Sequence, residues 1–152
     1  QVILAGRRIN DNMARYVARA TIKRMVKNNI DVTKATVGVL GITFKENCPD
    51  IRNSKIVDVI KEFDQWGIKV AVCDPWADAE EVKHEYGIDL VQVDAEHPVD
   101  SLVVAVGHNE FRALSPEQLR AYVKAEQPVL TDVKSLFNRD EMTAQGFTVF
   151  RL

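Results

Sequence analysis

Short apolar runs alternate with amphipathic segments along most of the chain, and this alternation restricts the possible folds more than any other feature. Six runs have the length and composition of buried strands, the third being weaker than the rest: 36–44, 68–74, 88–91, 101–108, 128–134 and 147–151. Four intervening segments have the apolar spacing of helices: 54–66, 78–87, 115–124 and 138–145. Strands that are apolar throughout and alternate with helices are typical of a parallel sheet covered on both faces.

The rule that parallel crossovers are right-handed then favours a doubly wound sheet. We therefore predict an α/β fold with a Rossmann-like, doubly wound and mostly parallel sheet of about six strands. Part of a long helix precedes the first strand and ends near Asn28-Asn29, and this helix either packs on the domain or belongs to an interface. Because the chain begins at Gln1 inside this helix, we interpret it as a fragment or a processed product.

Composition excludes several classes of protein. The chain has 152 residues and a net charge of −2, so it carries no general attraction to nucleic acid or to a membrane surface. No apolar run approaches the roughly 20 residues that span a bilayer, and no signal peptide is visible. The two cysteines, Cys48 and Cys73, suggest no disulfide framework, which favours a reducing cytoplasm. The three histidines are too scattered for a zinc site, so no metal is expected.

The turn after the first strand, GITFKENCPDIRNSK at 41–55, concentrates charged residues where doubly wound sheets bind ligands. Lys45, Arg52 and the helix start that follows offer cations and free N–H groups to an anion. The spacing equally allows an alternative, in which both cations are solvated and paired with the nearby acids Glu46 and Asp50.

Two other features of this region are interpreted as structural. Gly38 and Gly41 fall within the strand, and neither GxGxxG nor GxxxxGK[ST] is present, so a dinucleotide pyrophosphate on a Gly-rich turn is not expected. Cys48 has no histidine near it in the sequence and is interpreted as a small structural residue rather than a nucleophile.

Three stretches of the chain resemble a known family. They are G-I-T-F-K-E-N-C-P-D-I-R-N-S-K, W-G-I-K-V-A-V-C-D-P-W and E-E-V-K-H-E-Y-G-I, and they are similar to the C-terminal domain of the UDP-glucose/GDP-mannose dehydrogenase family. The first stretch is most similar to the branch that oxidises UDP-N-acetylhexosamines. The opening A-G-R-R-I-N-D-N-M resembles the end of the family's long central helix, so the resemblance covers essentially the whole chain.

This resemblance implies part of an NAD-dependent nucleotide-sugar 6-dehydrogenase of the cytoplasm. Such enzymes oxidise the C6 hydroxyl of a UDP-hexose or UDP-N-acetylhexosamine to a carboxylate in two hydride transfers, here for surface polysaccharide synthesis. The resemblance further implies that an N-terminal domain of the same protein binds NAD and that residues 31–152 bind the UDP-sugar. Residues 1–30 would be the end of the central helix, through which members of the family form homodimers.

The motif match also implies roles for individual residues. Phe44 and Lys45 are expected to contact the UDP-sugar, and Arg52 is expected to reach the cofactor. Lys134, in T-D-V-K-S, matches a basic substrate-binding position more loosely. The family's nucleophilic cysteine lies in a Gly-rich G-G-x-C segment, and neither cysteine of this chain has that context. We therefore expect no catalytic residue here and no activity from the chain alone.

One alternative function stays open, which is a non-catalytic nucleotide-binding or dimerisation module. A response-regulator receiver is excluded, because its paired acids at the end of the first strand are replaced by Phe44-Lys45. Asp74, after the second strand, is interpreted as a structural residue. His108 is interpreted as a loop histidine, although it follows the central strand and could face the same cleft.

Overall fold

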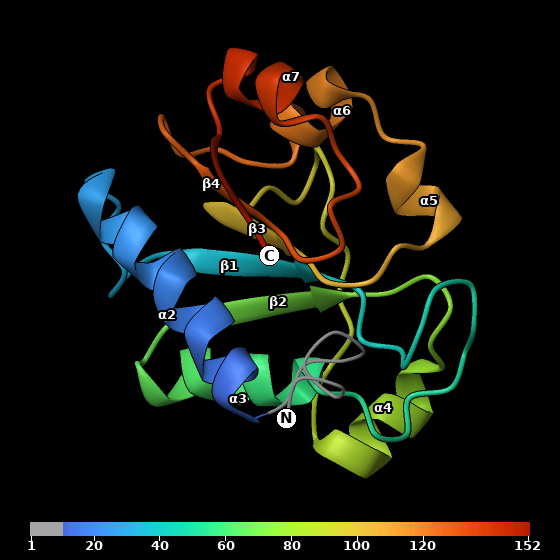
Figure 1. Ribbon diagram of the computed structural model, residues 1–152. Helices are drawn as coiled ribbons and strands as arrows, with labels where there is room; N and C mark the ends of the chain where they lie inside the picture. The colour runs from blue at the N-terminus through green and yellow to red at the C-terminus, as the bar shows by residue number, and fades with distance from the viewer. Residues whose placement is uncertain (1–10) are drawn as a thin grey trace.

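A computed structural model describes residues 11–152, and within them five parallel strands form one sheet in the order β2-β1-β3-β4-β5 (Figure 1). The strands are β1 (Thr36–Leu40), β2 (Lys69–Cys73), β3 (Ser101–Val104), β4 (Val129–Asp132) and β5 (Thr148–Arg151). Every neighbouring pair is parallel. The predicted doubly wound, Rossmann-like parallel sheet is confirmed, and its order is one of the two common orders of such sheets.

The sheet has five strands rather than about six, because the weak run at 88–91 does not form a strand. It makes one parallel bridge, between Leu90 and Val72, with the Val91 N–H donating to the Val72 carbonyl at 2.8 Å. Val91 is 46% exposed, so the segment leaves the edge of β2 after a single contact. It lies where a further strand beside β2 would give the classic order 3-2-1-4-5-6.

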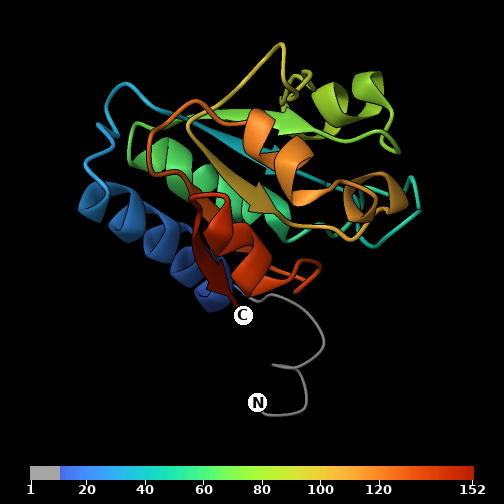
Figure 2. The ribbon, with the colours of Figure 1, turned by 90° about the horizontal axis from the view of Figure 1, so that it is seen from above.

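Helices cover both faces of the sheet. They are α2 (Asp11–Lys27), α3 (Ile56–Gln65), α4 (Ala79–Tyr86), α5 (Asn109–Arg112), α6 (Pro116–Ala121) and α7 (Arg139–Ala144). Figure 1 shows α2 and α3 on one side of the sheet and α6 and α7 on the other, and Figure 2 gives the same layers from above. The short helix α5 was not predicted from the sequence.

The two layers have separate apolar cores because successive strand residues point to opposite faces. Val37 and Val39 of β1 belong to the core that includes α2 and α3. Leu102 of β3 packs in the other core with Leu119 of α6 and Met142 of α7. Both cores are centred on the sheet, which makes it the rigid support for the loops at its ends.

Helix starts follow local sequence signals. Ser115 caps α6 in a complete capping box with Gln118, with Pro116 at the first position as the sequence predicts. Asp78 caps α4, whose end is marked by Gly87 at φ 70°.

Helix α2, which precedes β1, packs on the domain. Ala14, Val17 and Met25 are fully buried, and the Thr21 hydroxyl lies 2.6 Å from that of Thr131 on β4. Residues 1–10, which include the start of the predicted helix, lie outside the described residues. Within residues 11–152, no helix combines the length and the apolar character needed to cross a membrane.

Candidate functional site

The order of the strands places a switch point at β1. The chain runs from β1 outward to β2 and then returns to β3 on the other side of β1. The loops that follow β1 and β3 therefore diverge at the carboxyl ends of these strands. Ligands of doubly wound sheets bind in the crevice at this position.

A pocket of about 270 Å³ lies at this end of the sheet. Its walls come from 43–46 and 53–56 after β1, from 105–106 after β3, and from Lys134 after β4. The pocket thus brings Lys134 together with Phe44 and Lys45, which lie far from it in the sequence, and all three were predicted as substrate-binding residues. Phe44 is 53% exposed, so much of its ring is free to contact a ligand.

The pocket is suited to an anion. Lys45 and Lys134 are exposed, and neither has a carboxylate partner among residues 11–152. Helix α3 starts at the pocket wall, and its N-cap residue, Lys55, makes no side-chain capping bond. The first N–H groups of a helix are unsatisfied and carry a partial positive charge, so they favour a negatively charged group.

Ser54 adds a polar group that sequence reasoning missed. Ser54 lines the pocket and is only 8% exposed. Its hydroxyl nevertheless has no hydrogen-bond partner in the described part of the chain. A buried hydroxyl without a partner costs about 1–3 kcal/mol. Such a group is a candidate to bond a ligand, and no signal short of the structure would have distinguished it from a capping serine.

Arg52 does not line the pocket. Its guanidinium binds Asp50 with two hydrogen bonds of 3.0 Å, and its side chain is 82% exposed. The side-chain and backbone hydrogen bonds from Arg52 lower the pKa of the Asp50 carboxyl to about 2. The alternative of paired cations therefore holds for Arg52 and Asp50 but not for Lys45. The cofactor role of Arg52 stays a prediction.

Strained backbone surrounds the pocket. Four non-glycine residues between 11 and 152 have a positive φ, and three of them flank the pocket: Asn47, Asn53 and Ser135. Such conformations cost free energy and persist where the surrounding structure enforces them, which is common at ligand sites.

A buried carboxylate holds the strand ends in place. Asp74, after β2, accepts hydrogen bonds from the N–H groups of Ile42 and Thr43 at 2.7 and 3.1 Å. It also accepts from the N–H of Trp76 at 2.8 Å. Burial raises the pKa of Asp74, but the hydrogen bonds from His108 and from these backbone groups outweigh burial and lower it overall. The geometry agrees with the interpretation of Asp74 as structural.

His108 lies in the loop after β3, as the sequence suggested, but it is a buried residue with several polar contacts. It is fully buried, and its Nε2 lies 3.1 Å from Asp74 Oδ2 and 3.1 Å from Thr43 Oγ1. Its Nδ1 lies 2.9 Å from the backbone nitrogen of Asn47. His108 therefore connects the end of β3 to the turn that carries Phe44 and Lys45. It lies behind the pocket wall and does not line the pocket.

A second buried acid supports Lys134. Asp132, the last residue of β4, accepts hydrogen bonds from the N–H groups of Leu136 and Phe137 at 3.0 and 2.9 Å. These bonds close the turn in which Lys134 lies, so the pocket loop after β4 is also fixed from inside the fold.

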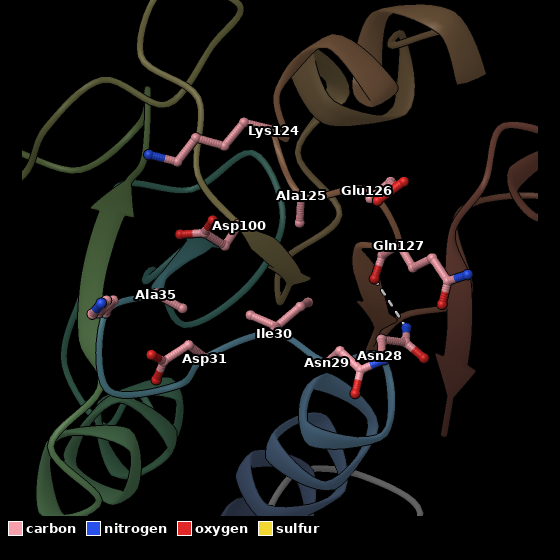
Figure 3. A pocket seen from close by; sticks show the side chains of 11 residues that line it. Asn28, Asn29, Ile30, Asp31, Ala35, Asp100, Lys124, Ala125, Glu126 and Gln127 are labelled. Carbon is pink, nitrogen blue, oxygen red and sulfur yellow. Dashed lines mark hydrogen bonds between the residues drawn. The ribbon is translucent and has the colours of Figure 1, made fainter.

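A larger hollow of about 450 Å³ lies at the opposite end of the sheet, where β1, β3 and β4 begin. Figure 3 shows acids and a lysine around it, including Asp31, Asp100 and Lys124. Two of its polar side chains bond within the fold: Asp100 accepts from the Thr36 N–H at 2.8 Å, and the Asn28 amide donates to the Gln127 carbonyl at 3.0 Å. Its place at the amino ends of the strands makes it a poor candidate for the ligand site.

Comparisons with known proteins agree with this placement. The UDP-binding domain of the UDP-glucose/GDP-mannose dehydrogenase family matches residues 38–139. A UDP-N-acetyl-D-glucosamine 6-dehydrogenase of Salmonella typhi is 49% identical over 88% of this chain and 31% of its own length. One of Pseudomonas aeruginosa is 45% identical over 93% of this chain and 33% of its own length.

A solved NDP-N-acetyl-D-galactosaminuronic acid dehydrogenase of Methanosarcina mazei has the same fold, with a TM-score of 0.84 and 21% identity over 99% of this chain and 31% of that one. The chain thus spans about a third of the length of the curated relatives it matches. The matched segment includes the end of β1 from residue 38, the whole turn at 41–55 and Lys134. The chain belongs to the UDP-glucose/GDP-mannose dehydrogenase family and carries its UDP-binding domain.

Proposed function

We propose that this chain is the substrate-side domain of an NAD-dependent nucleotide-sugar 6-dehydrogenase. The whole enzyme would oxidise a UDP-hexose or UDP-N-acetylhexosamine to the uronic acid for surface polysaccharide synthesis in the cytoplasm. Residues 31–152 would bind the UDP-sugar, and residues 1–30 would be the end of a central helix that supports a homodimer. The observation that carries the proposal is the convergence of Phe44, Lys45 and Lys134 on one pocket at the switch point of a UDP-binding domain.

The chemistry of the pocket suits a nucleotide diphosphate. Lys45 and Lys134 supply charge without a competing carboxylate partner among the described residues. The start of α3 at the pocket wall adds N–H groups. The exposed ring of Phe44 offers apolar surface beside these cations, which suits the sugar or the base of the ligand.

The size of the pocket supports a shared site. Ligand pockets that enclose a drug-sized molecule usually measure about 300–1,000 Å³. The pocket here holds about 270 Å³ and is open to solvent, so it accommodates only part of a UDP-sugar. A second domain would then complete the site. Without that domain the cations are exposed to water and contribute little binding free energy. We expect millimolar or weaker binding of a UDP-sugar by the 152-residue chain, and micromolar binding would contradict this division of the site.

The turn after β1 does not fit a dinucleotide of its own. Gly41 is not a phosphate-binding glycine, because a Cβ there would lie 2.6 Å from the Cβ of Val106. Because Gly41 has no side chain, the loops after β1 and β3 can approach each other closely. NAD would therefore be held mainly by another domain of the protein, with Arg52 as the one residue of this chain proposed to reach it.

The substrate class follows from the relatives' names. Two relatives at 45% identity or more are UDP-N-acetyl-D-glucosamine 6-dehydrogenases, which favours a UDP-N-acetylhexosamine over UDP-glucose. The test is NADH formation by the full-length protein that contains this chain, with NAD and UDP-N-acetylglucosamine, UDP-N-acetylgalactosamine or UDP-glucose. We expect turnover with a UDP-N-acetylhexosamine and none from the 152-residue chain. A full-length protein that binds these nucleotides without forming NADH would favour a non-catalytic nucleotide-binding module.

A further inference from the structure

We propose that His108 is a positioning residue that, as a neutral imidazole, sets the shape of the turn at 43–47 and thereby presents Phe44 and Lys45 to the pocket. The consequence for UDP-sugar binding rests on the proposed function. The effect on the turn itself does not, and it can be measured without any ligand.

The hydrogen-bond pattern fixes the protonation of the ring. The backbone N–H of Asn47 is always a donor, so His108 Nδ1, at 2.9 Å, must be an acceptor and carries no proton. The proton of the neutral ring is then on Nε2, where it is shared between Asp74 Oδ2 and Thr43 Oγ1, each at 3.1 Å. The Thr43 hydroxyl is free to accept this proton's hydrogen bond, because its own proton is donated to the Lys45 carbonyl at 3.0 Å.

The ring therefore contacts both sides of the turn. Through Thr43 it is connected to the backbone of Lys45, and through Nδ1 it holds Asn47, whose φ is 54°. Asn47 is held from its other side by Asn109, whose N–H donates to the Asn47 side-chain oxygen at 2.9 Å. A non-glycine residue with positive φ needs such support, because the isolated chain would leave that conformation.

Few charged groups lie near the His108 ring among the described residues, so an effect of the ring on the turn can be told apart from effects of other charges. Asp74 is the charged group in contact with the imidazole. Trp76 and Phe111 pack on the ring at centroid distances of 6.0 and 5.5 Å. Glu110 accepts from Trp76 Nε1 on the exposed side, and the side chains of Lys45 and Glu46 on the turn are exposed.

Protonation of His108 would reverse one of its contacts. The imidazolium carries a proton on Nδ1, which would face the Asn47 N–H as donor against donor. The link to Asp74 would persist, so the neutral ring is the form that holds Asn47.

Two substitutions of His108 distinguish the roles of its two ring nitrogens. His108→Asn keeps an acceptor near the position of Nδ1, whereas His108→Gln keeps a donor near the position of Nε2 and loses the acceptor. Amide hydrogen exchange of Asn47 is measured by NMR in the 152-residue chain. We expect exchange close to the wild-type rate in His108→Asn and about five- to tenfold faster exchange in His108→Gln, the effect of losing one hydrogen bond. The amide of Val17 in the core reports whether each variant is folded.

The wild-type chain provides a measurement that needs no variant. The ¹⁵N shifts of the His108 ring should identify the Nε2-protonated neutral tautomer at pH 7.5. A ring protonated on Nδ1 at that pH would overturn the proposal. Equal Asn47 protection in the two folded variants would also overturn it and leave the proposed function untouched.

The second part of the test uses the full-length protein with UDP-N-acetylglucosamine, whose diphosphate does not titrate near neutrality. We expect His108→Gln to raise KM several-fold with little change in kcat, and His108→Asn to restore KM. If the turn responded as expected in both variants but the affinity did not follow, the pocket would be wrongly assigned and the proposed function would fail.

Discussion

Asp74 and His108 form a buried pair in which the imidazole Nε2 lies 3.0 Å from Oδ1 and 3.1 Å from Oδ2 of the carboxylate. Asp74 follows β2 and His108 follows β3, while β1 lies between these two strands in the sheet. Asp74 also binds the N–H groups of Ile42 and Thr43, directly after β1. One carboxylate thus ties together three strand ends at the switch point, and the pocket is built on the loop that it fixes.

Replacing Asp74 by asparagine should destabilise the fold by about 2–4 kcal/mol near neutral pH, because an amide cannot accept all of these hydrogen bonds and one buried partner is left unpaired. The pKa of Asp74 is lower in the folded protein than its ordinary value, so its contribution is complete above the unfolded pKa of about 4. It is lost as the pH falls through the lower, folded-state pKa. Urea unfolding of wild type and variant should therefore converge in strong acid.

The matched control for this variant is Asp78→Asn. Asp78 caps α4 by accepting from the Glu81 N–H at 3.0 Å, and asparagine is an equally good N-cap. The control should lose little stability. An Asp74→Asn variant as stable as this control would show that the buried carboxylate does not hold the strand ends.

Lys45→Ala should weaken UDP-sugar binding to the full-length protein by about 1.5–3 kcal/mol, the range for a hydrogen bond to a charged group. Lys124→Ala is the control, because Lys124 is an exposed lysine beside the hollow at the other end of the sheet. Isothermal titration of both variants is the measurement. Equal affinities for Lys45→Ala and wild type would remove Lys45 from the site.

Ser54→Ala should change stability and binding in opposite directions. The unpaired buried hydroxyl is a cost in the free protein, so its removal should stabilise the ligand-free fold by about 1 kcal/mol. If the hydroxyl bonds the UDP-sugar, the same change should weaken binding by about 0.5–1.5 kcal/mol. Thermal unfolding with and without ligand measures both effects. A variant that is less stable without ligand and binds normally would place Ser54 among structural residues.

Arg52→Lys should lower turnover of the full-length enzyme while leaving UDP-sugar affinity nearly unchanged, because lysine cannot reproduce a two-pronged contact with the cofactor. The structure adds a control, since Arg52 is paired with Asp50 in the free domain. Asp50→Asn weakens that pair and leaves Arg52 in place, so turnover should be largely retained. Equal losses in both variants would mean that Arg52 acts only by bracing the turn.

The sequence was sufficient for features that depend on local periodicity. Continuous apolar runs predicted all five strands, and Ser115-Pro116 predicted the start of α6. The strand expected at 36–44 ends at Leu40 because Gly41 takes φ 104° and the next two N–H groups turn to Asp74. That end is set by a residue more than thirty positions away, which periodicity cannot report. Likewise, whether 88–91 becomes a strand depends on the edge of β2.

The candidate site was predictable only where its residues belong to a local motif. A motif in one stretch indicated Phe44 and Lys45, and a looser match indicated Lys134, which the fold brings to the same pocket. The contacts of His108 could not be predicted because its partners are Asp74, Asn47 and Thr43, at separations of 34, 61 and 65 residues. Ser54 gave no signal because an unsatisfied hydroxyl is a property of the packed structure alone.

The central claim is that the pocket between Phe44 and Lys134 binds the diphosphate of a UDP-sugar. An NMR titration of the 152-residue chain with UDP-N-acetylglucosamine tests it most directly, because chemical shifts detect millimolar binding and locate it. We expect saturable shifts at the amides of Lys45, Ser54 and Lys134, and none at Asn28 or Lys124. Shifts centred on Asn28 and Lys124, or no saturable shift at the pocket, would contradict the account.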